Sequence, residues 1–430
     1  MKGKIVSLVA LLTICWFGQR LFAQNSRDVV AGIPVNYDEV KAGSYSLPDP
    51  LITARGIRIK RAQDWLKKRR PEILRMFEEE QFGRVPGKPA DLSFRVFDRG
   101  TPVLNGKAIR KQATIYFTSN TASSYKTDLL LYLPAASKKP APLLLNISFT
   151  PNIALANDQG VKPGMVWSKE GKRVAPTRIN TPGFNLEELI NAGFGFATLC
   201  YTDIEPDMPQ GILYGIRGKY LTQGATQPAS DEWGAISAWS WGLSRVMDYL
   251  ETDSLIDAHR VALTGASRLG KTVLWTGARD SRFALIIASI SGEGGAALSR
   301  RNFGETIAHL TAPARYPYQF AANYGKYAEH VNEMPFDSHM LVSLIAPRPL
   351  LLQTGNTDNW SDPKGEFLAA QAASPVYRLF GKDGPAGKAM PAANDPVLLL
   401  NPLGYYMHEG GHTVLPADWA QFILFMKRYL

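Results

Sequence analysis

The chain has 430 residues, of which 45% are hydrophobic and 20% are charged. This composition excludes a disordered protein, a collagen-like repeat and a coiled coil. The formal net charge is +10, from 48 basic and 38 acidic residues, and is compatible with nucleic acid, a membrane surface or an acidic substrate. Two cysteines cannot form a disulfide framework.

The N-terminus has the pattern of a secretory signal peptide. Lys2 and Lys4 precede the apolar run 5–17, and we expect cleavage after Ala23. The run is too short to span a bilayer, and no later segment is long and apolar enough to do so. We therefore expect residues 1–23 to be removed and the mature protein to be periplasmic or secreted. Loss of Lys2, Lys4 and Arg20 would lower the net charge from +10 to +7. The alternative is a buried N-terminal strand or helix.

A basic cluster at residues 67–70 could indicate nucleic-acid binding. Three glutamates follow closely at 78–80, and no aromatic residues are interleaved with the cluster to stack on bases. Pro71 is expected in the first turn of a helix. We predict that the cluster is a solvated helix face and that the protein binds no nucleic acid.

From about residue 142 the chain alternates predicted strands and helices. Short, continuous apolar runs of this kind are typical of strands buried on both faces of a parallel sheet; they lie at 142–147, 195–200, 260–264, 284–288 and 349–353. Helical stretches lie between and after them, at 185–192, 233–250, 271–278 and 417–429. The alternation predicts an α/β fold with a mostly parallel central sheet and helices on both faces. We expect a single domain over 24–430, with residues 24–110 as an N-terminal extension packed on it.

The strongest local motif is Gly-Ala-Ser-Arg-Leu-Gly-Lys at 265–271, between a predicted strand and a helix. This is the setting of a nucleophile elbow, in which a serine sits on a strained turn and needs small neighbours. The usual motif has its second glycine two residues after the serine, whereas Gly270 comes three after Ser267. The alternatives are a structural turn with Ser267 as helix N-cap and a phosphate-binding loop, for which the glycine spacing is short.

A serine nucleophile needs a histidine base, which in α/β-hydrolases follows the serine and the acid in the chain. His408 and His412 lie between the last predicted strand and the last predicted helix. We expect His412 to be the base because it is nearer to the final helix, and His408 is the alternative.

The acid that orients the histidine is expected after a late strand. Asp358 follows the predicted strand 349–353 and is the preferred candidate. Asp362 and Glu293 are rivals, and each could equally be a solvated loop carboxylate.

The motif 265–271 resembles the Gly-x-Ser-Arg-x-Gly-Lys signature of the glucuronoyl esterases, carbohydrate esterase family 15. Further similar stretches lie in the same order, at 291–301, 304–305, 346–349, 360–367 and 408–412. The resemblance covers about residues 55–430 and is strongest to bacterial members. It implies an α/β-hydrolase fold, a three-layer sandwich, without a metal or an organic cofactor.

The resemblance also implies roles for individual residues. Ser267 matches the family nucleophile and His412 its base, and Arg268 matches an arginine that stabilises the oxyanion. Lys271, Glu305 and Trp360 match residues that hold sugar hydroxyls; taken alone, they read equally well as a helix lysine, a surface glutamate and a core tryptophan.

One position departs from the family pattern. Many members carry a catalytic glutamate just before the Ser-Gly sequence, where this chain has Ile290. The acid must then come from elsewhere, which favours Asp358.

The resemblance implies hydrolysis of the ester between 4-O-methyl-glucuronic acid of glucuronoxylan and a lignin-type alcohol. An acetyl xylan or other carbohydrate esterase and a non-catalytic carbohydrate-binding relative are the alternatives. We expect a monomer with a glucuronoxylan or lignin–carbohydrate ester as its partner, and no membrane association.

Overall fold

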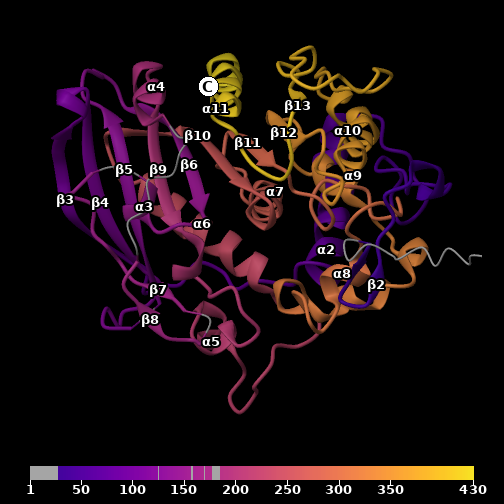
Figure 1. The fold of residues 1–430 in the computed structure, drawn as a ribbon, viewed down its shortest axis with the longest axis horizontal. Helices are drawn as coiled ribbons and strands as arrows, with labels where there is room; N and C mark the ends of the chain where they lie inside the picture. The colour runs from indigo at the N-terminus through magenta and orange to yellow at the C-terminus, as the bar shows by residue number, and fades with distance from the viewer. Residues whose placement is uncertain (1–27, 124, 156–157, 169, 177–184) are drawn as a thin grey trace, which may run out of the picture.

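The computed structural model describes residues 28–430 apart from 124, 156–157, 169 and 177–184 (Figure 1). The expected signal peptide, residues 1–23, lies outside the described residues and remains a prediction. Among the residues that are described, no helix is long and apolar enough to cross a membrane.

Within the described residues, nine strands form one central sheet, in the order β13-β12-β11-β10-β6-β9-β5-β4-β3. Their bounds, in chain order, are β3 Ser93–Val103, β4 Ala108–Tyr116, β5 Lys126–Pro134, β6 Ala141–Ser148, β9 Gly195–Cys200, β10 Ile256–Ala266, β11 Leu285–Ser289, β12 Leu350–Gly355 and β13 Leu403–His408. Two short hairpins lie outside this sheet and are formed by β1 Val29–Val30 with β2 Ile33–Pro34, and by β7 Val166–Trp167 with β8 Arg173–Val174.

The six neighbouring strands from β13 to β9 are parallel, and the remaining pairings toward β3 are antiparallel. All five apolar runs singled out in the sequence lie in parallel strands: β6, β9, β10, β11 and β12. The sheet is therefore mostly parallel, as predicted. Strand β13 was not predicted, because its sequence Leu-Gly-Tyr-Tyr-Met-His contains no continuous aliphatic run.

Helices cover both faces of the sheet. The α-helices are α1 Ala62–Asp64, α2 Arg70–Glu80, α3 Asn152–Leu155, α4 Leu186–Asn191, α5 Ile216–Tyr220, α6 Ala235–Leu250, α7 Arg268–Arg279, α8 Ile307–Thr311, α9 Ser338–Ser343, α10 Pro363–Arg378 and α11 Pro416–Tyr429. A π-helical turn, Trp65–Arg69, joins α1 to α2. Short 3-10 turns lie at Glu39–Ala42, Leu104–Gly106, Tyr201–Asp203, Gly211–Leu213, Pro317–Gln319, Ala322–Tyr327 and Val331–Glu333.

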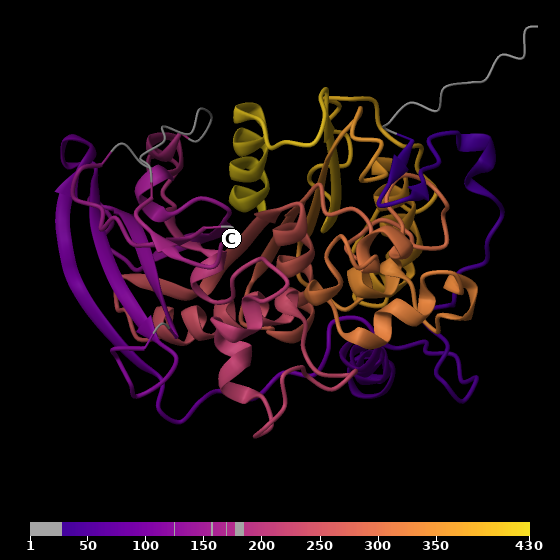
Figure 2. The same ribbon diagram turned by 60° about the horizontal axis from the view of Figure 1, so that its bottom comes forward.

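Side-chain alternation along the strands divides the core into two layers. Leu143 and Leu145 of β6 belong to the core cluster that includes residues of α2, α6, α7, α9 and α10. Leu144 belongs to the cluster on the opposite face, which includes residues of α3, α4 and α11. Figure 2 shows α11 on one side of the sheet and α2 on the other. This three-layer sandwich is the α/β-hydrolase fold.

The N-terminal region is partly continuous with the sheet. Residues 93–110, which we had assigned to the extension, form the edge strand β3 and the start of β4. The earlier residues pack against the C-terminal half of the chain; for example, Asn36 bridges to Gly304, and Glu39 pairs with Lys364 at 2.8 Å. The N-terminal segment therefore lies beside the loops that follow the late strands.

The basic cluster at 67–70 is only half solvated, so the prediction of a solvated face is wrong for two of its residues. Arg69 is buried and pairs with Glu72 at 3.0 Å. Arg70 donates to the carbonyl oxygens of Leu344 and Ala278, at 3.1 and 2.5 Å. Both guanidinium groups therefore have partners within the fold, a carboxylate for Arg69 and two backbone carbonyl oxygens for Arg70.

Candidate active site

The site lies where β10, β12 and β13 end at the carboxyl edge of the parallel strands. Ser267 follows β10, Asp358 follows β12 and His412 follows β13. Because carboxyl ends of parallel strands share one edge, residues 145 positions apart in the chain come into contact.

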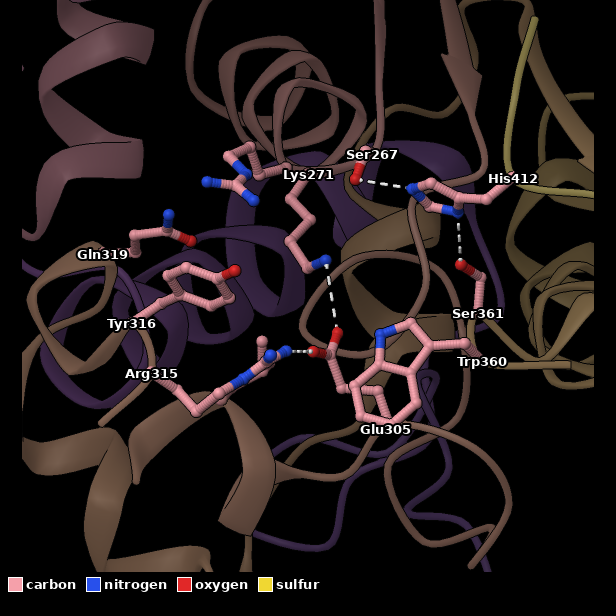
Figure 3. A pocket seen from close by; sticks show the side chains of 11 residues that line it. Ser267, Lys271, Glu305, Arg315, Tyr316, Gln319, Trp360, Ser361 and His412 are labelled. Atoms are coloured by element: carbon pink, nitrogen blue, oxygen red, sulfur yellow. Dashed lines mark hydrogen bonds and ion pairs between the residues drawn. The ribbon is translucent and has the colours of Figure 1, made fainter. Parts of the chain in front are cut away.

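Ser267 occupies a strained turn between β10 and α7. Its φ of 57° and ψ of −128° are unusual for a residue with a side chain, and such strain persists only where the surroundings fix it. Ser267 is the N-cap position of α7, but its side chain makes no capping hydrogen bond. Its Oγ is directed to His412 instead, which argues against the purely structural turn (Figure 3).

The two glycines of the motif allow close backbone approach. A Cβ on Gly265 would lie 2.7 Å from the carbonyl oxygen of Leu269, and one on Gly270 would lie 2.6 Å from that of Ser289. Gly270 therefore lets α7 pack directly on the end of β11. This explains why the second glycine comes three residues after the serine.

His412 contacts both Ser267 and Asp358. Its Nε2 lies 2.9 Å from Ser267 Oγ, and its Nδ1 lies 2.7 Å from Asp358 Oδ2 and 3.0 Å from Ser361 Oγ. Asp358 is 4% exposed, whereas the His412 side chain is 42% exposed. The imidazole thus bridges a buried carboxylate and an accessible hydroxyl, with Nδ1 donating to the carboxylate and Nε2 accepting from the serine.

Backbone hydrogen bonds fix the two loops that carry Asp358 and His412. Thr357 N donates to Gly410 O at 2.9 Å, and Asn356 N donates to His408 O at 3.0 Å. The acid and the histidine are therefore held in one rigid unit at the ends of β12 and β13.

His408, the alternative base, has a different environment. It is buried, its Nδ1 lies 2.8 Å from Asp418 Oδ2, and its Nε2 lies 3.3 Å from Gly411 O. Burial opposes the charged form, but the hydrogen bond and charge of Asp418 outweigh it and raise the pKa of His408. His408 supports the backbone next to His412.

The rival acids, Asp362 and Glu293, have other partners. Asp362 caps α10 and pairs with Arg301 at 2.9 Å, and burial raises its pKa to about 6. Glu293 accepts from Ser299 Oγ at 2.6 Å and Tyr324 OH at 2.9 Å, and burial raises its pKa to about 8. Within the described part of the chain, the carboxylate that bonds to His412 belongs to Asp358, and not to Asp362 or Glu293.

A cavity of about 200 Å³ opens beside Ser267 and His412 on the α7 face of the sheet (Figure 3). All the predicted site residues except Asp358 line it, together with four unpredicted polar or aromatic residues and one leucine. The full lining is Ser267, Arg268, Lys271, Glu305, Leu310, Arg315, Tyr316, Gln319, Trp360, Ser361 and His412.

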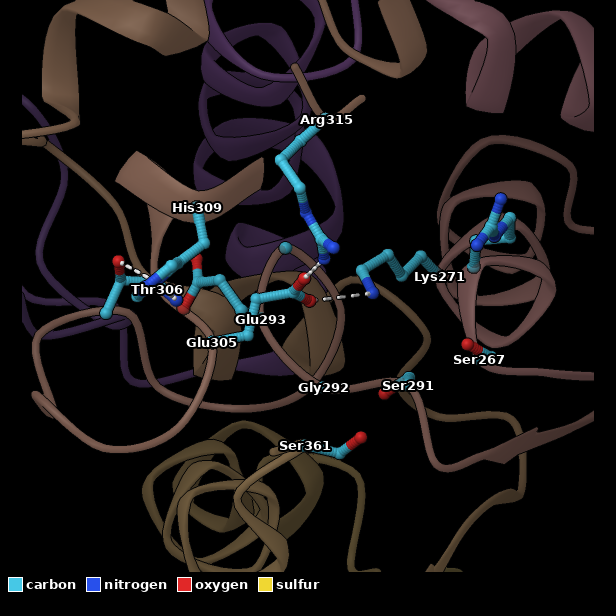
Figure 4. Close-up of polar contacts among 12 residues, drawn as sticks. Ser267, Lys271, Ser291, Gly292, Glu293, Glu305, Thr306, His309, Arg315 and Ser361 are labelled. Atoms are coloured by element: carbon cyan, nitrogen blue, oxygen red, sulfur yellow. Dashed lines mark hydrogen bonds and ion pairs between the residues drawn. The ribbon is translucent and has the colours of Figure 1, made fainter. Parts of the chain in front are cut away.

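Glu305 holds two cations at the floor of this cavity. Its carboxylate oxygens lie 3.9 Å from Lys271 Nζ and 3.1 Å from Arg315 Nη2 (Figure 4). Burial lowers the pKa of Lys271, and the negative charge of Glu305 opposes that shift. Trp360 contributes a wall, with the Arg315 guanidinium 5.5 Å from its ring centre. Arg315 was missed in the sequence because a lone arginine in an irregular loop carries no motif.

Arg268 is held by a carboxylate that sequence analysis also missed. Asp207 pairs with its guanidinium and accepts from the Tyr318 hydroxyl at 3.0 Å and Gln319 Nε2 at 2.7 Å. The Arg268 guanidinium lies 4.7 Å from the ring centre of Tyr316. Asp207 raises the pKa of Arg268 against the opposing effect of burial, so Arg268 is a fixed cation at the mouth of the cavity.

No group of three or more His, Cys, Asp and Glu side chains in the described part of the chain is arranged to hold a metal ion. The chemistry available in the cavity is that of an activated hydroxyl beside fixed charges. It suits nucleophilic attack on a carbonyl group.

Comparison with known proteins places the chain in a family. The model described as "Glucuronyl esterase, fungi" matches residues 226–381. Carbohydrate esterase MZ0003, from an unknown prokaryotic organism, is 39% identical over 406 residues, which is 92% of each chain. The 4-O-methyl-glucuronoyl methylesterase of Cerrena unicolor is 29% identical over 363 residues, 82% of this chain and 65% of that protein.

Solved structures agree with these relatives. A glucuronoyl esterase from Solibacter usitatus is 44% identical, with a TM-score of 0.86 over 91% of this chain and 100% of that one. A promiscuous CE15 esterase from a marine bacterial metagenome is 39% identical, with a TM-score of 0.83 over 92% of this chain and 100% of that one.

The sheet, its helical layers and the serine turn after β10 define an α/β-hydrolase, and the family is one of carboxylic ester hydrolases. The chain belongs to the glucuronoyl esterase family, carbohydrate esterase family 15.

The close approach at Gly270 yields a prediction on stability. Gly270→Ala should lower the free energy of unfolding by about 1–3 kcal/mol, because the new Cβ must displace backbone at the end of β11. Urea denaturation measures this loss. Gly325→Ala is the control, since the nearest atom to its Cβ would be 4.0 Å away. Equal stability of the two variants would contradict the packing argument.

Proposed function

We propose that the protein hydrolyses the ester between 4-O-methyl-glucuronic acid of glucuronoxylan and an alcohol. The observation that carries the proposal is the chain of contacts from Ser267 through His412 to Asp358, at 2.9 and 2.7 Å, at the wall of a charged cavity. Family membership supports the reaction class, and the charged cavity supports a hydroxyl-rich acyl group.

In the first half-reaction Ser267 attacks the ester carbonyl carbon. His412 Nε2 takes the Oγ proton as the Oγ–C bond forms, and Asp358 stabilises the imidazolium through Nδ1. The carbonyl π electrons move to oxygen, and the resulting tetrahedral intermediate collapses. The ester C–O bond then breaks as His412 returns its proton to the departing alcohol oxygen.

In the second half-reaction water hydrolyses the glucuronoyl-serine ester. His412 takes a proton from the water, whose oxygen attacks the same carbonyl carbon. The bond to Ser267 Oγ breaks, and Oγ recovers the proton from His412. The products are glucuronic acid on the polysaccharide and a free enzyme.

Arg268 is proposed to stabilise the negative charge that develops on the carbonyl oxygen. A cation already fixed by Asp207 needs no reorganisation during the reaction, which is the condition for efficient electrostatic stabilisation. Its backbone amide, next to the nucleophile, is the second proposed donor.

Lys271, Glu305 and Trp360 are proposed to bind the sugar. Lys271 and Glu305 can donate to and accept from vicinal hydroxyls, and Trp360 offers an apolar face to the ring. An acetyl group has no hydroxyls to meet the remaining hydrogen-bonding capacity of Lys271 and Glu305, which favours a uronoyl over an acetyl substrate. Arg315 joins this group because it shares Glu305 with Lys271.

We also propose that the protein is exported and acts as a monomer on plant cell-wall material. The leader-like N-terminus supports export, and the relative from Cerrena unicolor is named a 4-O-methyl-glucuronoyl methylesterase. The net charge of +7 expected after cleavage suits an acidic polymer, although such steering is weak and sensitive to salt.

Removing the nucleophile tests the reaction. Ser267→Ala should lower kcat for a glucuronate methyl or benzyl ester by roughly 10⁴-fold or more. The assay is alcohol release across a panel of glucuronoyl, acetyl and feruloyl esters. The wild type should favour the glucuronoyl esters. Full activity of the variant would refute Ser267 as nucleophile, and a preference for acetyl esters would refute the substrate.

A series of acid variants tests the assignment of Asp358. Asp358→Asn should lower kcat by roughly 10⁴-fold, because the amide no longer stabilises the imidazolium. Asp362→Asn and Glu293→Gln, the matched controls, should each lower kcat by less than about tenfold, since neither carboxylate contacts His412. A mild effect at Asp358 with a severe one at either control would overturn the assignment.

The anchoring of Arg268 yields a third prediction. Asp207→Asn should lower kcat by about 10- to 100-fold with little change in KM, because a misplaced guanidinium stabilises the transition state less well. Steady-state kinetics with the methyl ester measure both constants. Asp98→Asn removes a carboxylate from another arginine pair, at 2.7 Å from Arg110, and should leave both constants unchanged. Unaltered kcat in Asp207→Asn would show that the anchor is dispensable.

A further inference from the structure

A second cavity of about 230 Å³ lies on the other face of the sheet from the first. Its floor is formed by residues at the carboxyl ends of three adjacent strands: Asn146 of β6, Thr264 of β10 and Ser289 of β11. Its walls include Trp419 and Phe422 of α11. Deeper positions on the same face are apolar, so the polar floor is confined to the edge where the nucleophile lies.

The two cavities lie on opposite sides of the nucleophile turn. Lys271 of α7 lines the first cavity, whereas Ala266, directly before Ser267, lines the second. Figure 1 shows α7 and α11 on opposite sides of strands β10 and β11. Phe149 marks the boundary, because it lines the second cavity while its ring centre lies 5.9 Å from the Arg268 guanidinium.

The geometry of an ester relates these two cavities to the reaction. The carbonyl carbon is bonded to the sugar ring on one side and to the alkoxy oxygen on the other. A sugar ring in the first cavity therefore directs the alkoxy group away from that cavity. His412 must reach the alkoxy oxygen to protonate it. The chain runs from His412 to Val414 in two residues, and Val414 lines the second cavity.

The lining of the second cavity selects an aromatic alcohol. Phe149, Trp419, Phe422 and Val414 present apolar or aromatic surface, against which a flat ring packs favourably. A cavity of roughly 150 Å³ lined by such side chains is enough to bind benzene, so one ring fits. The Ser289 hydroxyl at the floor is buried and makes no hydrogen bond to another described group.

A third cavity, of about 640 Å³, is less suited to the alcohol. It is lined by Tyr37, Asp358, Trp360 and His412 and, like the second cavity, not by Ser267, so the side of the imidazole on which it lies decides its relation to the reaction. Asp358 bonds to His412 Nδ1, on the side of the imidazole opposite Nε2 and the serine. The imidazole therefore separates this cavity from the reacting carbon.

We propose that the cavity between Phe149 and α11 is the subsite for the leaving alcohol and takes an aromatic alcohol, with its ring against Trp419. The inference rests on the proposed function, because it concerns the alcohol released by that reaction. It assigns the two substituents of the ester to the two faces of the sheet.

The test is the ratio of kcat/KM for a benzyl to a methyl ester of 4-O-methyl-glucuronic acid. Trp419→Ala should lower this ratio by about 3- to 10-fold, since it removes the aromatic wall. Leu155→Trp should lower it similarly by filling the cavity, whose lining includes Leu155. Phe97→Ala is the control; Phe97 is 40% exposed on β3, and its loss should leave the ratio unchanged.

The outcomes separate the inference from the proposed function. Hydrolysis of both esters, with an unchanged ratio in folded Trp419→Ala and Leu155→Trp, would overturn the alcohol subsite and leave the proposed function standing. If Trp419→Ala fails to fold, as judged by its thermal transition, Leu155→Trp decides alone. Failure of the wild type to hydrolyse either ester would overturn the proposed function and the inference with it.

Discussion

The site depends on the position of one imidazole ring. His412 lies 2.9 Å from Ser267 and 2.7 Å from Asp358, and these two contacts join the ends of β10, β12 and β13. The serine is held by a strained turn packed on β11, and the acid and the histidine are held by paired loops. Each element of the constellation is therefore set by strand ends and backbone hydrogen bonds, which suits a reaction that tolerates little displacement.

Electrostatics distinguish the floor of the cavity from its surroundings. Burial opposes the charged form of Glu293 and of Glu366, a buried residue of α10, and raises the pKa of each to about 8. Glu305 lies between Lys271 and Arg315, at 3.9 and 3.1 Å. On the mouth of the cavity, Asp207 is shared among Arg268, Tyr201, Tyr318 and Gln319 and fixes the guanidinium. These fixed charges support the proposed roles of Arg268 toward the carbonyl oxygen and of Lys271 and Glu305 toward the sugar.

The sequence predicted the parts of the site that lie next to strongly patterned strands. Ser267 and Asp358 follow continuous apolar runs, and His412 precedes the final helix. The order serine, acid, histidine could therefore be recognised in the sequence. Lys271, Glu305 and Trp360 were expected only through the family resemblance. Asp207, which pairs with Arg268, and Arg315, which lines the cavity, were not found, because both lie in irregular segments whose placement depends on tertiary packing. Strand β13 was not predicted because it contains no continuous aliphatic run. Arg69 and Arg70 were predicted to be solvated because the backbone carbonyl oxygens that accept their hydrogen bonds come from distant parts of the chain and cannot be identified from the local sequence.

The central claim is that Ser267 is an activated nucleophile in an accessible cavity. Reaction with a fluorophosphonate probe, followed by peptide mass mapping, tests it most directly. We expect a single adduct on Ser267 that is lost in Ser267→Ala and forms much more slowly in His412→Ala. No adduct in the folded wild type, or an adduct on another serine, would contradict the account.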